Sequence, residues 1–93
     1  MTTQTTEKPL FIPLRTHWFN EFALGNKTHE YRLYGSRWNE KTCRVGRKAI
    51  LSRGYGKQER LERTVVSAKI VAPTLSFIQI YGEGKQCLAI ELA

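Results

Sequence analysis

The sequence predicts a small, mostly β domain of the α+β class: a partly closed β-barrel of five or six short strands with one short helix near its N-terminus. Short apolar runs with strand-like alternation recur between residues 10 and 92, separated by glycine or proline. The 93 residues are 41% hydrophobic, which suffices for one core. Because closure removes most of the edges that a five-stranded sheet exposes, a half-closed barrel is favoured.

Residues 8–93 are expected to form this single domain. Residues 1–7 are rich in threonine and lack apolar periodicity, which predicts a disordered tail. The first strand is expected at residues 10–14. Its Pro13 confines the strand to a sheet edge, because proline has no N–H to donate to a neighbour.

One helix of about two turns is expected after that strand. Thr16 is a plausible N-cap, and Gly25 stands where a glycine commonly ends a helix. Trp18 and Phe22 are four residues apart, so their side chains lie on one side of the helix. We expect this aromatic side to pack against the core.

The next segment, residues 28–33, alternates as a strand does. Thr28, Glu30 and Arg32 share one face, and the intervening residues share the other. We expect the second face to enter the core, which leaves the charged face open for chemistry.

The remainder reads as loops and strands, with residues 61–71 the clearest strand. Within it, Thr64, Val66, Ala68 and Ile70 are expected on one face. Residues 77–81 fit either a strand or a helical turn. The other expected elements are a loop over 34–42, a strand over 48–52, a glycine-rich hairpin tip over 53–58 and a closing strand over 87–92.

Composition excludes several classes of protein. No apolar run approaches the roughly 20 residues that span a bilayer, and the N-terminal residues lack the features of a secretory signal. A cytoplasmic protein without membrane contact is therefore expected. Cys43 and Cys87 are too few for a disulfide framework or a zinc site, so we expect free thiols, and neither a metal nor another cofactor. A monomer is expected.

The positive charge is concentrated in the middle of the chain. The protein has 15 lysines and arginines against 8 glutamates, a net charge of +7. Residues 27–57 hold nine of the basic residues and two of the acidic ones, and so carry this whole net charge. Such a segment is typical of a surface that binds phosphates, although net charge also keeps small proteins in solution.

The segment Gly25-Asn-Lys-Thr-His-Glu-Tyr-Arg32 combines a turn, two cations and an acid. Lys27 lies at the turn, and Glu30 and Arg32 follow on one face of the strand. With the strand and helix before it, this segment resembles the Gly-x-Lys-Thr-x-Glu-x-Arg signature of the ASCH domain family in the PUA-like superfamily. Residues 43–50 and 87–92 are similar to later strands of the family, although Arg47 stands where aspartate is usual.

The resemblance implies a β-barrel with a cleft beside the motif and a role in binding RNA or a nucleotide-like ligand. Lys27 and Arg32 could neutralise a phosphate, and Glu30 could accept a hydrogen bond from an exocyclic amine. Alternatively, Glu30 pairs with these cations and closes the barrel mouth. The residues that would line the cleft are Lys27, Thr28, Glu30 and Arg32.

Aromatic residues lie among the cations around this motif, a combination that suits the stacking of unpaired bases. Core packing is the alternative for them, above all for Trp18 and Tyr31. The residues expected to contact nucleic acid are Arg37, Trp38, Arg44, Arg47, Lys48, Arg53, Tyr55 and Lys57.

Two other functions remain open. The first is a small hydrolase of RNA or a nucleoside, with Lys27 and Glu30 as candidate catalytic residues. The amidohydrolases that this chain resembles remove the acetyl group of acetylcytidine with the motif lysine, a threonine and a glutamate on a later helix. This chain has Glu30 in place of that threonine, and residues 73–81 are too short a link to carry that helix. The second is an accessory protein that binds an acidic protein partner.

Overall fold

The structure, a computed structural model, describes residues 7–57 and 59–93. The predicted mostly β, partly closed fold is confirmed: five strands form one mixed sheet in the order β1-β3-β4-β5-β2. The predicted tail falls, for residues 1–6, outside the described residues. The elements are β1 (Leu10–Leu14), α1 (Thr16–Ala23), β2 (His29–Leu33), β3 (Lys48–Arg53), β4 (Arg60–Val71), α2 (Leu75–Tyr81) and β5 (Cys87–Leu92).

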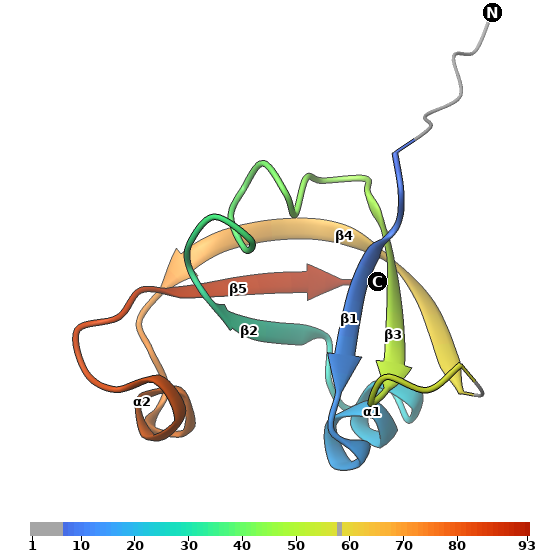
Figure 1. The fold of residues 1–93 in the computed structure, drawn as a ribbon, viewed down its shortest axis with the longest axis horizontal. Helices are drawn as coiled ribbons and strands as arrows, with labels where there is room; N and C mark the ends of the chain where they lie inside the picture. The colour runs from blue at the N-terminus through green and yellow to red at the C-terminus, as the bar shows by residue number, and fades with distance from the viewer. Residues whose placement is uncertain (1–6, 58) are drawn as a thin grey trace, which may run out of the picture.

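The sheet curls because one long strand belongs to both of its halves. The first part of β4 pairs with β3, and the second part pairs with β5. Figure 1 shows β4 as an arch over the molecule. The parallel strand β1 and the antiparallel strand β2 form the two edges of the sheet, which do not pair with each other. The barrel is therefore open along a seam between β1 and β2.

The predicted face of β4 is wrong, because a β-bulge interrupts the alternation of the strand. The register shifts between Val65 and Ser67, so the alternation changes phase there. Val65 is buried, whereas Val66 and Ile70 are 43% and 46% exposed. Strict alternation across residues 61–71 predicted that Val66, Ala68 and Ile70 share one face of the strand. Of these three residues, Ala68 packs against the core.

The core fills the concave side of the curled sheet and the inner side of α1. As predicted, Gly25 follows this helix with a positive φ of 80°. The helix begins at Thr16, so Arg15 and not Thr16 is its N-cap, and α1 packs by Phe19 and Phe22. Trp18, which the four-residue spacing placed on the packed side with Phe22, is instead 41% exposed. The buried cluster comprises Leu10, Ile12, Leu14, Phe19, Phe22, Trp38, Cys43, Ala49, Leu51, Val65, Leu88, Ile90 and Leu92.

The predicted orientation of β2 was wrong. Glu30 is the most buried residue of the strand at 9% exposure, while Tyr31 and Leu33 are half-buried. The charged face turns toward the seam because the cations on either side of Glu30 neutralise it there.

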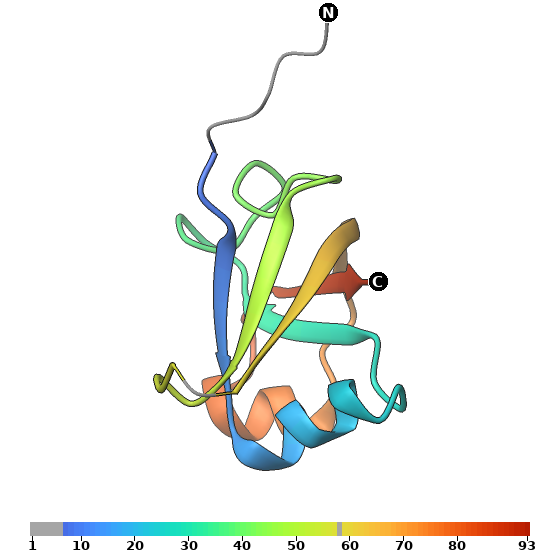
Figure 2. The ribbon, with the colours of Figure 1, turned by 90° about the vertical axis from the view of Figure 1, so that its right-hand side faces the viewer.

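Residues 75–81 form a second helix, which the sequence left undecided. Pro73 precedes Thr74, whose hydroxyl caps the helix by accepting a hydrogen bond from the Phe77 amide at 3.1 Å. Phe77 and Tyr81 then pack together at 4.7 Å between ring centroids. Figures 1 and 2 show α1 and α2 on the same side of the curled sheet, below the arch of β4.

The two cysteines are free and buried, as predicted. Burial raises the pKa of both thiols. Among the described residues, no helix has the length and apolar character that a membrane crossing requires.

Candidate functional site

A cavity of about 440 Å³ lies at the open seam, and we call it the seam pocket. Side chains from both sheet edges and from both helices line it. Figure 1 shows the two helices beside the open side of the arch. Failure of β1 and β2 to pair thus creates space beside two helices. Its lining residues are Pro13, Leu14, Arg15, Trp18, Lys27, Glu30, Tyr31, Arg32, Thr74, Ser76, Phe77, Ile80 and Tyr81.

Glu30 organises the charged wall of the seam pocket. Its Oε2 accepts a hydrogen bond from Arg32 Nε at 2.9 Å, and Arg32 Nη2 lies at the same distance. Its Oε1 lies 3.9 Å from Lys27 Nζ. The three side chains are only 11–18% exposed. They therefore both line a cavity and form an ion-pair cluster, which combines the two alternatives that the sequence left open.

The Lys27 ammonium lies in a cage of aromatic rings. Its Nζ is 4.7 Å from the Trp18 ring centroid, 5.2 Å from that of Tyr31 and 5.7 Å from that of Phe22. The negative faces of these rings attract a cation. Burial nevertheless lowers the pKa of Lys27, and the charge of Glu30 offsets part of this effect.

Arg32 ties the two edges of the sheet together across the seam. Its Nη2 donates a hydrogen bond of 2.8 Å to the carbonyl of Pro13 on β1. Its guanidinium also lies 4.8 Å from the ring centroid of Trp38. Since β1 and β2 share no ladder, this side chain fixes the width of the seam beside the pocket.

Thr28, the fourth residue expected in the cleft, does not line the seam pocket. It is exposed, and its hydroxyl lies 2.9 Å from His29 Nδ1. His29 in turn lies 4.0 Å from Glu91 on the neighbouring strand. The motif therefore contributes three of its four expected residues to the cavity.

Several lining residues were not foreseen from the sequence. Phe77 and Tyr81 come from α2, and Arg15 comes from the link between β1 and α1. The Pro73-Thr74 pair, a helix start signal, and the spacing of Phe77 and Tyr81 by four residues could have revealed the helix. Together with Trp18 and Tyr31, these two rings give the pocket four aromatic side chains.

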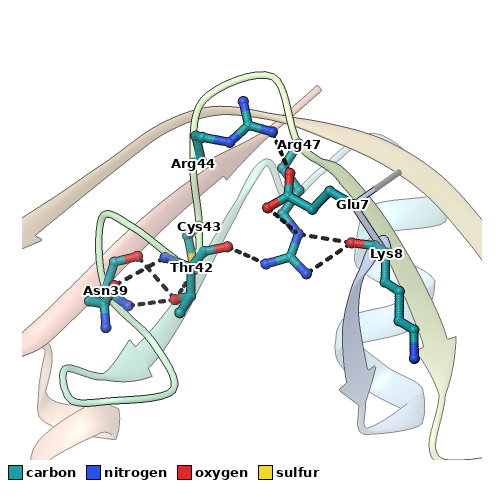
Figure 3. Close-up of polar contacts among 7 residues, drawn as sticks. All are labelled: Glu7, Lys8, Asn39, Thr42, Cys43, Arg44 and Arg47. Carbon is teal, nitrogen blue, oxygen red and sulfur yellow. Dashed lines mark hydrogen bonds and ion pairs between the residues drawn. The ribbon is translucent and has the colours of Figure 1, made fainter. Parts of the chain in front are cut away.

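Arg44 and Arg47 lie in the loop before β3 rather than at the pocket. Both pair with Glu7, and Arg47 also donates hydrogen bonds to the carbonyls of Lys8 and Thr42 (Figure 3). Asn39 holds the same loop through hydrogen bonds from the Lys41 and Thr42 amides to its Oδ1. Arg47 is thus a structural tie between the first described residues and this loop.

The other cations of the basic segment are spread over the molecule. Lys48 and Arg53 stand at opposite ends of β3, about 17 Å apart at the usual rise of a strand. Lys48 pairs with Glu62 at 3.4 Å, and Arg53 pairs with Glu59 at 2.7 Å. Arg53 also donates to Asn20 on α1.

The remaining residues expected to contact nucleic acid differ in exposure. Trp38 is buried in the core, with 8% exposure, so little of its ring is open to a base. Arg37 is exposed above that ring, at 5.3 Å from its centroid. Tyr55 and Lys57 are exposed in the β3–β4 hairpin, outside the seam pocket.

The described part of the chain holds no group of three or more histidine, cysteine, aspartate or glutamate side chains that could bind a metal ion. No protein-family model matches the chain, and no curated protein matches it. The case for a function therefore depends on the geometry of the pocket.

Proposed function

We propose that this protein is a binding module that holds one unstacked base of an RNA, or a nucleotide of similar chemistry, in the seam pocket. One observation carries the proposal: a single cavity combines four aromatic side chains, two cations of low exposure and the buried glutamate between them. Its volume of about 440 Å³ lies within the usual range for small-molecule sites.

The aromatic wall supports a planar ligand. Trp18 is 41% exposed and lines the cavity, so an incoming ring can cover it without displacing the core. Stacking of a base on such a side chain contributes about 1–3 kcal/mol.

The cations support an anionic ligand. Arg15 is exposed at the cavity and has no carboxylate partner among the described residues, so its guanidinium can take a phosphate as a bidentate ligand. Lys27 and Arg32 add positive potential from the pocket wall, where burial limits screening by salt. Glu30 keeps both of them in position.

We further propose that the chain is an ASCH-type domain of the PUA-like superfamily. The convergence of Lys27, Glu30 and Arg32 on one cavity beside a curled five-stranded sheet supports this, because the resemblance implies a cleft at that motif. Two residues depart from what the resemblance implies. Arg47 donates a hydrogen bond to the Lys8 carbonyl, and the Thr28 hydroxyl faces His29.

Binding is favoured over hydrolysis. Both oxygens of Glu30 face cations, which leaves it a poor candidate for the general base. Thr28 lies outside the cavity lining, so its hydroxyl is badly positioned for attack on a ligand there.

Tryptophan fluorescence with the four ribonucleoside monophosphates and short single-stranded RNAs at low salt tests the proposal. We expect quenching of the exposed Trp18 and, in a parallel calorimetric titration, a loss of about 1–3 kcal/mol in binding on Trp18→Ala. Tyr55→Ala removes an aromatic ring that is 82% exposed outside the pocket, and should leave the affinity unchanged.

Absence of binding to every nucleotide and RNA would overturn the proposal, as would equal effects of the two variants. Acetylcytidine belongs in the same panel. Product that disappears in both Lys27→Ala and Glu30→Gln would replace the binding function with hydrolysis.

A further inference from the structure

A second cavity, of about 320 Å³, lies beside the seam pocket. It is lined by residues 33–38 and by Tyr81, and Tyr81 also lines the seam pocket. The loop that forms it begins where β2 ends, and the Tyr34 amide fixes this loop by donating to the Gln86 carbonyl at 3.0 Å. The two cavities are therefore neighbours that share one aromatic wall.

Trp38 supplies a second link between the cavities. The Arg32 guanidinium, which lines the seam pocket, lies 4.8 Å from the Trp38 ring centroid, and the Arg37 guanidinium, which lines the second cavity, lies 5.3 Å from it. Because Trp38 is only 8% exposed, its ring is a fixed support for both cations. One buried ring thus holds a positive charge in each cavity.

The charge of Arg37 is available to a ligand. Arg37 is exposed and forms no ion pair with a carboxylate in the part of the chain that the structure describes. The carboxylate of Glu40 in the same loop instead accepts a hydrogen bond from the Tyr34 hydroxyl at 2.5 Å. In contrast, Arg44, Lys48 and Arg53 are each paired with a glutamate.

We propose that the two cavities are successive subsites for single-stranded RNA of at least two nucleotides. This inference rests on the proposed function, and it adds the size of the ligand. The seam pocket takes one base, Tyr81 separates that base from its neighbour, and Arg37 binds the phosphate that joins the two nucleotides. A planar guanidinium suits a phosphate because it can donate two parallel hydrogen bonds.

Isothermal titration of a nucleoside monophosphate and of the matching dinucleotide, each with a 5′-phosphate, tests this inference at one salt concentration. We expect the dinucleotide to bind about tenfold more tightly, the gain of one charge-assisted contact. Arg37→Ala should abolish that gain and leave the affinity for the monophosphate unchanged. Lys41→Ala is the matched control, because Lys41 is an exposed cation of the same loop that lines neither cavity.

Equal affinities for the two ligands would overturn the second subsite while leaving the base pocket intact. A gain that survives Arg37→Ala would also overturn it. Failure of both ligands to bind would instead refute the proposed function itself.

Discussion

The seam pocket and the basic segment after it use their cations in different ways. In the pocket, Lys27 and Arg32 share the single buried carboxylate of Glu30, and all three side chains line a cavity. Along residues 44–53, four cations pair with glutamates from elsewhere in the chain; Arg44, Lys48 and Arg53 are 31–64% exposed, and Arg47 is 17% exposed.

This difference shows that charge density along a sequence does not predict which cations come together in the fold. Lys48 and Arg53 lie at opposite ends of β3, and Arg47 donates its hydrogen bonds to backbone carbonyls, so the cations of this segment do not gather in one cluster. In the pocket, Lys27, Glu30 and Arg32 form one cluster of low exposure, and the Lys27 ammonium adjoins aromatic rings. The proposed site therefore depends on the geometry of the pocket and not on net charge.

The largest expected effect on stability comes from Glu30→Gln. The change removes the negative charge between two poorly exposed cations, and breaking such a buried pair costs about 3 kcal/mol. For a domain of this size, the melting temperature should fall by more than about 10 °C. Thermal melts followed by circular dichroism measure it.

Glu62→Gln is the matched control for Glu30→Gln. Its pair with Lys48 is more than 60% exposed on both sides, so we expect a change within about 0.5 kcal/mol. Similar small losses in the two variants would show that the pocket cluster is no more important to stability than a surface pair.

A smaller loss is expected for Arg47→Ala, which leaves the carbonyls of Lys8 and Thr42 without this donor (Figure 3). Charge-assisted hydrogen bonds of this kind are worth about 2 kcal/mol. Arg44→Ala should change the free energy of unfolding by about 0.5 kcal/mol, because its side chain is 52% exposed where it pairs with Glu7. Urea denaturation of both variants compares them, and equal losses would contradict a structural role for Arg47.

The most subtle effect concerns the titration of Lys27. Its pKa should lie below 10.5, because burial disfavours the ammonium. Glu30→Gln should lower the pKa further, since the glutamate charge partly offsets burial. The ¹³Cε chemical shift of Lys27 as a function of pH reports this pKa, and a rise on Glu30→Gln would contradict the account.

The lowered pKa of Lys27 also makes the stability of the fold depend on pH. Between the lowered pKa and 10.5, the unfolded chain binds the Lys27 proton more tightly than the folded protein does. The contribution of Lys27 to stability therefore rises with pH in that window, and its burial penalty is fully present below it.

Much of the fold could be predicted because local signals agree with it. Pro13 marked an edge strand, Gly25 marked the end of α1, and alternation marked the strands. The bulge at Val65 could not be found, because it depends on the register with β5, a strand that is distant in sequence. The second helix was left undecided because a seven-residue element has little periodicity.

The site could be predicted only in part. The motif placed Lys27, Glu30 and Arg32 close together but left open whether they line a cleft or pair with one another, and the structure shows both. Arg15 and Tyr81 were missed because they reach the pocket from elements that are distant in sequence. Such convergence arises from the curl of the sheet, which no local pattern encodes.

The most direct test of the account is a ¹H–¹⁵N correlation titration with a single ribonucleoside monophosphate, in which the two tryptophan indoles serve as internal reporters. We expect the exposed Trp18 indole and the amides of Tyr31 and Phe77 to shift, because they line the seam pocket. The amides of Lys48 and Arg53 should not move. Shifts centred on Lys48 and Arg53, with the Trp18 indole unchanged, would contradict the claim that the ligand binds in the seam pocket and not along the basic segment.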